Sequence, residues 1–151
     1  MLRARLSETL KSALKARDQR TVSTVRLILA AVKDRDITFR GSGKGECIMD
    51  EEILNLLQTM IRQRRESIGL FEQGGRQDLA DRERKEIEVI REFLPRQLGD
   101  EQIAAATREV IEELRAEGLK DMGRVMGTLK AKYAGQMDFS KASSVVRELL
   151  H

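Results

Sequence analysis

The sequence is poor in the side chains that most often carry enzyme chemistry. Its 151 residues include one cysteine, one histidine, one tyrosine and no tryptophan. The histidine, His151, is the last residue, so no internal imidazole is present to act as a general base or metal ligand. The single cysteine, Cys47, excludes an intrachain disulfide and a Cys/His zinc cluster. We therefore expect no catalytic residue, no metal site and no cofactor.

Long apolar runs are also missing. No stretch is apolar and long enough to predict a transmembrane helix. The first residues, MLRARLSETLKSAL, alternate charges with leucines and lack the continuous apolar core of a secretory signal. Together with a single cysteine, which suits a reducing compartment, this pattern predicts a cytoplasmic protein without membrane association.

Glycine is concentrated in one segment that resembles a phosphate-binding loop but fails its pattern. A P-loop reads G-x-x-x-x-G-K-[ST], because backbone N–H groups wrap the phosphates and the hydroxyl holds magnesium. The candidate segment is GSGKG, residues 41–45. When Gly43-Lys44 is aligned with the G-K of the pattern, the position of the first glycine is occupied by Thr38 and that of the hydroxyl residue by Gly45. The segment therefore predicts a mobile surface loop over residues 36–49 and no nucleotide site.

The residues that are abundant are helix formers. Hydrophobic residues make up 40% and charged residues 35% of the chain, which has one proline. Apolar residues recur at helical spacing in four segments before that proline. The first starts at Leu2, and the second frays at residues 34–36 and ends before the glycine segment. The third has Asp50 as its N-cap and stops at Gly74-Gly75, and the fourth ends at Leu94-Pro95.

Three more helices are predicted after the proline, at about 100–117, 121–133 and 138–150, with Asp121 and Asp138 as caps. No segment alternates like a strand. The break from Leu94-Pro95 to Gly99-Asp100 separates the two sets. The predicted fold is all-α, with a helical N-terminal domain over 1–94 and a three-helix C-terminal domain over 98–151.

Charge is distributed unevenly along this chain of net charge +3. Residues 1–47 carry eleven Lys/Arg and five Asp/Glu. Residues 100–117 carry two Lys/Arg and six Asp/Glu, whereas residues 118–151 carry six Lys/Arg and three Asp/Glu. The C-terminal domain is therefore expected to have one acidic helix and one basic side, which permits nucleic-acid binding without requiring it.

Four segments resemble one known family across nearly the whole chain. They are RTVSTVRLILAAVK (20–33), LQTMIRQRRESIGLFEQGGRQDLA (57–80), FLPRQL (93–98) and DMGRVMGTLKAKYAGQMD (121–138). In their order and spacing these segments are similar to the GatB/YqeY family, and the chain resembles a free-standing YqeY-like protein of bacterial kind.

The resemblance implies a role near tRNA. In that family the C-terminal helical module is shared with the tail of the B subunit of the glutamine-dependent tRNA amidotransferase, where it helps to hold the tRNA. The family label is a carbon–nitrogen ligase with glutamine as amido donor. The catalytic part of that subunit has no counterpart in these residues, so we expect no glutaminase, ATPase or amidotransferase turnover by this protein alone.

The implied tRNA-binding residues lie in the C-terminal domain. Gly123 and Gly127 are one helical turn apart, so another backbone can approach closely, and that backbone is either the preceding helix or an RNA strand. Gly127→Val is expected to destabilise the helix packing, whatever the partner. The positive charges that would meet phosphates are Arg124, Lys130, Lys132 and Lys141. The family's usual basic residues around Gly135 are replaced by Ala134 and Gln136.

A second basic cluster, Arg62, Arg64 and Arg65, has two interpretations. It forms either a salt-bridge network, with Arg62 pairing with Glu66 and Arg65 reaching carboxylates near Glu51 or Asp78, or a contact to a ligand or RNA. Because only five residues are aromatic, a bound RNA would be a folded one read through phosphates and 2′-hydroxyls. The expected partner is tRNA or a tRNA-charging or amidotransferase complex; the alternative is a helical protein–protein adaptor.

Overall fold

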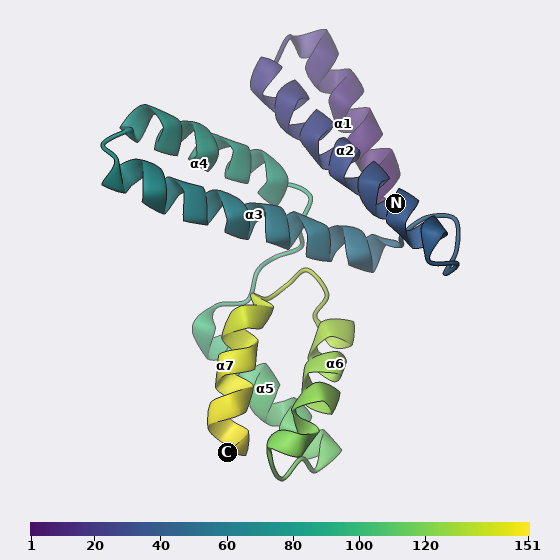
Figure 1. The fold of residues 1–151 in the computed structure, drawn as a ribbon, viewed down its shortest axis with the longest axis vertical. Coiled ribbons are helices and arrows are strands. Elements are labelled where there is room, and N and C mark those ends of the chain that lie inside the picture. Colours follow the sequence, from purple (N-terminus) through teal and green to yellow (C-terminus); the bar gives the residue numbers. More distant parts are fainter. The chain divides into compact units, whose positions relative to one another are not determined.

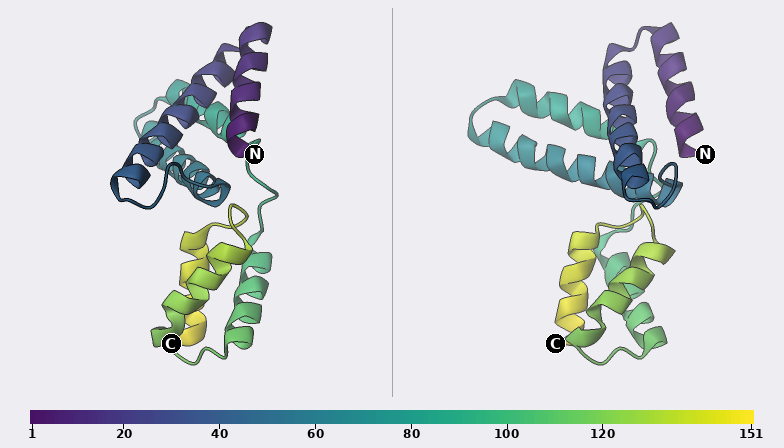
Figure 2. Two further views of the ribbon diagram at one scale, coloured as in Figure 1. Left: turned by 90° about the vertical axis from the view of Figure 1, so that its right-hand side faces the viewer. Right: turned by 45° about the vertical axis from the view of Figure 1, so that its right-hand side comes forward.

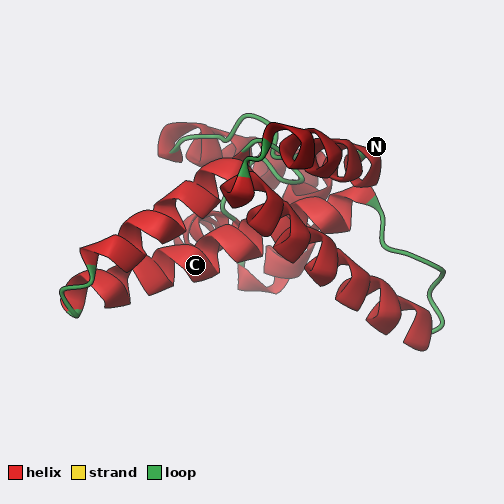
Figure 3. Ribbon diagram, turned by 90° about the horizontal axis from the view of Figure 1, so that it is seen from above, coloured by secondary structure: helices red, strands yellow, loops and turns green.

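The computed structural model describes residues 1–151 and is entirely helical, with seven α-helices, one short 3-10 helix and no strand (Figures 1 and 3). This confirms the predicted all-α class. The chain forms two compact units, Met1–Pro95 and Arg96–His151. The division into two domains over 1–94 and 98–151 stays a prediction.

The first unit begins with a hairpin of α1 (Leu2–Ala16) and α2 (Gln19–Gly41) (Figure 1). Arg17 adopts a left-handed conformation, with φ of 57°, and ends α1. The carboxylate of Asp18 then accepts a hydrogen bond from the Thr21 backbone N–H at 3.2 Å and caps α2. A two-residue connection therefore suffices to reverse the chain.

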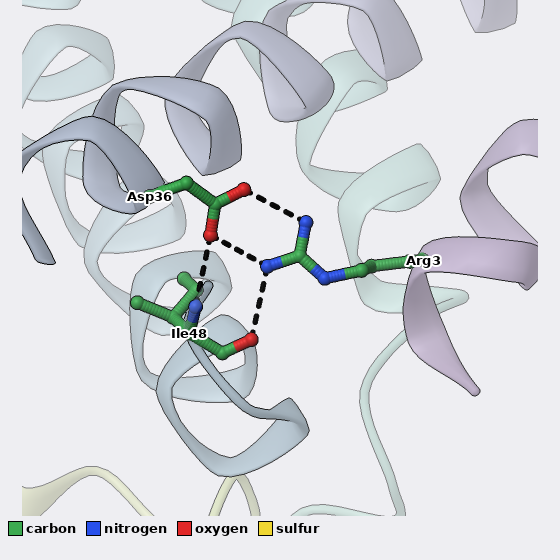
Figure 4. A network of polar contacts seen from close by, with 3 residues as sticks. All are labelled: Arg3, Asp36 and Ile48. Carbon is green, nitrogen blue, oxygen red and sulfur yellow. Dashed lines mark hydrogen bonds and ion pairs between the residues drawn. The ribbon is translucent and has the colours of Figure 1, made fainter. Parts of the chain in front are cut away.

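Helix α2 continues past the point where the sequence predicted its end. Residues 34–41 are helical, so the connecting loop covers only residues 42–49, and the prediction of a loop from residue 36 is wrong. The reason is a tertiary contact to Asp36 (Figure 4). Its carboxylate accepts two hydrogen bonds from the Arg3 guanidinium, at 2.6 and 2.8 Å, and one from the Ile48 N–H at 2.9 Å.

A second hairpin consists of α3 (Asp50–Gln73) and α4 (Gln77–Arg91). Met49, not Asp50, is the N-cap of α3, and Asp50 lies in its first turn with two glutamates, where the helix dipole favours negative charge. The helix ends at the predicted glycines, and Gly75 has a φ of 73° that favours glycine. Helix α4 ends at Arg91, slightly before the predicted stop at Leu94-Pro95.

One hydrophobic core holds the two hairpins of this unit together. Helix α2 packs against α4 as well as against α1 and α3. Burial of these apolar side chains is the main stabilising term. The fully buried members are Leu6, Val25, Ile28, Ile53, Leu57 and Ile90.

The second unit is a three-helix bundle (Figure 2). Its helices are α5 (Asp100–Leu114), α6 (Met122–Lys132) and α7 (Phe139–Leu150), with a 3-10 turn at Leu119–Asp121, as predicted apart from trimmed ends. Asp138 caps α7 by accepting from the N–H groups of Ser140 and Lys141. Its fully buried core residues are Val110, Val125, Leu129, Met137, Ala142 and Val146.

Candidate nucleic-acid interface

Helix α6 has one buried face and one bare face. Val125 and Leu129 are fully buried in the core of the second unit. The opposite face, which contains Gly123, Gly127 and Lys130, is exposed. A Cβ added to either glycine would meet no atom within 4 Å. The interpretation that these glycines allow close packing of the preceding helix is therefore wrong.

Nothing within the fold requires glycine at these two positions. Neither Gly123 nor Gly127 has a positive φ, and both lie in a helix, where each glycine costs about 1 kcal/mol relative to alanine. A side chain at Gly127 would project into open space, so the expected packing defect of Gly127→Val has no structural basis. The face leaves the backbone of α6 accessible to another molecule.

Three of the four candidate cations on this unit already have acidic partners. Arg124 pairs with Asp121 at 3.2 Å, Lys132 with Glu113 at 2.7 Å, and Lys141 with Asp100 at 3.1 Å. Lys130 forms no ion pair. The predicted basic side is therefore partly neutralised. The pairs of Lys132 and Lys141 are exposed and contribute little in water, where salt screens them, whereas the Asp121 side chain that pairs with Arg124 is only 18% exposed.

The acidic partners Glu113 and Asp100 were missed by the sequence reasoning. Both belong to α5, whose negative charge was recognised, but the side-by-side placement of α5 with α6 and α7 follows only from the fold. The hydrogen bond from Lys132 to Glu113 raises the pKa of Lys132. The lysine is charged at neutral pH with or without this shift, and an anion would have to displace Glu113 to pair with it.

Asp121 does not cap α6 through its side chain. Its carboxylate instead accepts from the Glu117 N–H at 3.0 Å, and this backbone hydrogen bond, with smaller help from Arg124, lowers the pKa of Asp121. The start of α6 therefore holds a fixed negative charge, so an anion would have to approach the helix along its exposed side.

The segment around Gly135 has a structural role. Gly135 is buried, has a φ of 74° that favours glycine, and accepts a hydrogen bond at its carbonyl from the side chain of Gln97. The neighbouring Gln136 carbonyl accepts from the Leu98 N–H at 2.7 Å. These contacts tie the connection between α6 and α7 to the start of the unit.

The second basic cluster separates into one structural and two exposed residues. Arg64 is only 13% exposed and donates from Nε to Glu86 at 2.9 Å, linking α3 to α4. Arg62 and Arg65 are exposed, and neither forms the predicted pair with Glu66 or with carboxylates near Glu51 or Asp78. The salt-bridge interpretation holds for Arg64 alone.

No group of three or more His, Cys, Asp or Glu side chains lies close enough together to hold a metal ion. Of the seven α-helices, none combines the length and apolar character needed to cross a membrane.

Comparison with known proteins gives matches over nearly the full chain. The YqeY family, described as Yqey-like protein, matches residues 3–150. A protein of Eremothecium gossypii named "Altered inheritance of mitochondria protein 41, mitochondrial" is 27% identical over 150 residues, covering 97% of this chain and 79% of the relative. Two proteins of the same name match part of the chain. The one from Lachancea thermotolerans is 34% identical over 91 residues, 60% of this chain, and the one from Saccharomyces cerevisiae is 28% identical over 89 residues, 59% of this chain.

In the L. thermotolerans and S. cerevisiae relatives, the matched part spans about half the relative's length, 46% in each. All three relatives are fungal proteins whose names place them in mitochondria, whereas the sequence suggested a bacterial kind of protein in the cytoplasm. The family match extends through both compact units of the fold, from α1 to the end of α7. The chain belongs to the YqeY-like protein family.

Proposed function

We propose that the second unit binds tRNA through the exposed face of α6, and that the protein is an accessory factor for tRNA charging or amidation. The observation that carries this proposal is the pair Gly123 and Gly127, which leave helix backbone bare beside the unpaired Lys130. An RNA backbone can approach such a face closely, with its phosphates next to the lysine.

The surrounding charges fit a folded RNA. Arg124 and Lys132 lie on the same short helix, and both cations are exposed, so each can exchange its carboxylate partner for a phosphate; Lys132 pairs with Glu113 of α5 and so extends from a different side of α6 than the glycines. The two aromatic residues of this unit, Tyr133 and Phe139, are partly buried against its core, so they do not form a base-stacking platform. The contacts available are therefore to phosphates and ribose.

The protein alone is proposed to be non-catalytic, despite the amidotransferase label that the resemblance implies. The only histidine is the terminal His151, and the exposed Cys47 is the single thiol. We expect no glutamine-to-glutamate conversion, with or without ATP and charged tRNA. Turnover that disappears when an acidic residue is replaced would overturn this. A cytoplasmic location is likewise a proposal.

A salt titration of tRNA binding tests the proposal. With about four phosphate contacts, the slope of log K against log salt is expected to be on the order of −3 to −4, and Lys130→Ala should make it less steep by about 1. The triple variant, in which Arg124→Ala and Lys132→Ala are combined with Lys130→Ala, should have a still less steep slope.

The glycine face is tested by adding bulk without charge. Gly123→Gln with Gly127→Gln should weaken tRNA binding about tenfold or more while keeping the fold, because both side chains enter open space. Gly69→Gln is the matched control: Gly69 also lies in a helix, α3, with no atom within 4 Å of its Cβ position, and this variant should bind tRNA normally. Equal binding by both variants would overturn the proposed face.

Absence of tRNA binding at low salt would overturn the tRNA proposal as a whole. In that case the adaptor function is tested with the same variants, by capturing protein partners before and after nuclease treatment.

A further inference from the structure

The first unit contains a polar cavity that the tRNA proposal does not use. It has a volume of about 480 Å³ and lies between α2 and α4, lined by residues from the first two turns of α2 and the N-terminal half of α4. This volume is within the range of small-molecule sites, which is roughly 300–1,000 Å³.

The acidic side chains of this cavity are already engaged elsewhere. Three carboxylates line it, and each forms an ion pair with an arginine that does not. The pairs are Asp78 with Arg76 at 3.1 Å, Asp81 with Arg84 at 2.9 Å, and Glu86 with Arg64 at 2.9 Å. These three carboxylates therefore have partners outside the cavity, although Arg84 also pairs with Glu72 at 2.8 Å and Arg64 also contacts Glu83 at 3.8 Å.

The basic side chains of the cavity have no such partners. Arg20 from α2 and Arg82 and Lys85 from α4 all line it, and none of the three forms an ion pair. The cavity is therefore lined by three positive side chains that are free of ion pairs, beside three carboxylates that are paired outside it. Two are guanidinium groups, whose planar donors match the oxygens of a phosphate in pairs.

A buried hydroxyl adds a spare donor. Thr24 lines the cavity, is fully buried, and its Oγ1 has no hydrogen-bond partner within the protein. Threonines elsewhere in these helices donate to the carbonyl four residues earlier, as Thr59 does to Asn55 and Thr107 to Ile103. Leaving a buried hydroxyl unpaired is unfavourable, so the Thr24 hydroxyl is a spare donor, which would meet an acceptor in the cavity after a shift of its enclosed side chain.

We propose that this cavity binds the phosphate group of a small phosphorylated molecule. Arg20, Arg82 and Lys85 supply the charge, and the Thr24 hydroxyl supplies a neutral hydrogen bond. A phosphate alone would not fill 480 Å³, so the rest of the molecule has room beside it.

The test uses calorimetric titration of the full chain with inorganic phosphate and with pyrophosphate, at constant ionic strength, and with acetate as the control anion. Pyrophosphate should bind more tightly than phosphate, and acetate should not bind. Arg20→Gln and Arg82→Gln should each lower the affinity for pyrophosphate about tenfold or more. Arg26→Gln, which removes an exposed charge of α2 outside the cavity, should leave the affinity unchanged.

Thr24→Val separates a binding role from a structural one. It removes the hydroxyl at nearly constant volume, so it should raise the melting temperature of the free protein by a few degrees while weakening pyrophosphate binding several-fold. Unchanged binding in this variant would overturn the role of the hydroxyl.

Two results would overturn the proposal. One is the absence of phosphate and pyrophosphate binding; the other is equal binding by Arg82→Gln and Arg26→Gln. A duplex RNA oligonucleotide is included as a second arm. If Arg82→Gln weakens binding of the RNA while wild type binds neither small anion, the phosphates recognised belong to RNA, and the small-molecule proposal fails.

Discussion

Arg3 joins three segments that are far apart in the sequence. Its guanidinium, in the first turn of α1, donates two hydrogen bonds to Asp36 near the end of α2 and one to the Ile48 carbonyl before α3 (Figure 4). The Asp36 side chain is only 13% exposed. The Arg3 hydrogen bond lowers the pKa of Asp36, and the Ile48 N–H acts in the same direction. This one side chain thus ties the last turns of α2 to α1 and to the chain before α3.

Asp36→Asn should therefore destabilise the protein by about 2 kcal/mol, since it breaks charge-assisted hydrogen bonds in a mostly buried place. Arg3→Lys should give a smaller loss, because an ammonium keeps the charge but cannot donate in the bidentate geometry. Urea denaturation at pH 7 measures both. A midpoint unchanged in Asp36→Asn would show that the network does not stabilise the fold.

The stability difference should also depend on pH. Because the pKa of Asp36 is lowered in the folded state, its contribution is present above the unfolded pKa, about 3.9, and is lost as the pH falls through the folded value. The midpoints of wild type and Asp36→Asn should therefore differ at pH 7 and converge below about pH 4. A constant difference over this range would contradict the assignment to Asp36.

An arginine of α3, Arg64, links the hairpin of α3 and α4 by contacting two glutamates of α4 at different distances. Arg64 contacts Glu86 at 2.9 Å and Glu83 at 3.8 Å, and all three side chains are less than a quarter exposed. Burial raises the pKa of Glu83, and the neighbouring Glu86 adds to the effect; together they exceed the attraction of Arg64. Glu86 is therefore the true partner, whereas the charge on Glu83 is unfavourable.

Replacing each glutamate by glutamine should give opposite results. Glu86→Gln should lower stability by about 1–3 kcal/mol, because it leaves Arg64 without its hydrogen-bonded partner. Glu83→Gln should raise the melting temperature at pH 7. The raised pKa of Glu83 means that the folded state favours the neutral carboxyl, so the protein loses stability as the pH rises through that pKa, and glutamine is neutral at every pH. Thermal unfolding of the two variants checks this; a loss in both would mean that both carboxylates stabilise the hairpin.

The helices themselves were predictable because their signals are local. Apolar residues at helical spacing, the Gly74-Gly75 pair and the Asp138 cap were sufficient to place α3 and α7 to within a few residues. The end of α2 was missed because the polar run at 34–36 weakens the local pattern, and its partner Arg3 is more than thirty residues away. Charge partners were missed for the same reason, since Arg64 could not be told from Arg62 without the α3–α4 register.

The glycines of α6 show a different limit of the sequence. Spacing of one turn correctly predicts that Gly123 and Gly127 share a face of the helix. It does not say whether that face meets the core or the solvent, because a stripe with no side chains carries no hydrophobic signal. Only the positions of Val125 and Leu129 in the core show that the glycines point outward.

The chain as a whole consists of two compact units, each with a hydrophobic core of its own. The second unit begins at Arg96, within the break at about 95–100 that the sequence indicates. The Gln97 side chain donates to the Gly135 carbonyl, and Leu98 packs on the core while its N–H donates to Gln136. Residues 96–98 are thus part of the structure of this unit. This segment, called the strap below, is hydrogen-bonded to the turn between α6 and α7.

We expect the fragment Arg96–His151 to fold on its own, with a helical circular dichroism spectrum and a cooperative thermal transition, because its core is complete. A matched fragment over 99–151 should be less stable by about 1–3 kcal/mol, since it loses the partly buried Leu98 and two hydrogen bonds to the 135–136 turn. The change should spare the α6 face, so both fragments should bind tRNA alike below their melting temperatures. If Arg96–His151 lacks helical structure, the units depend on each other for folding; if both fragments melt together, the strap contributes nothing.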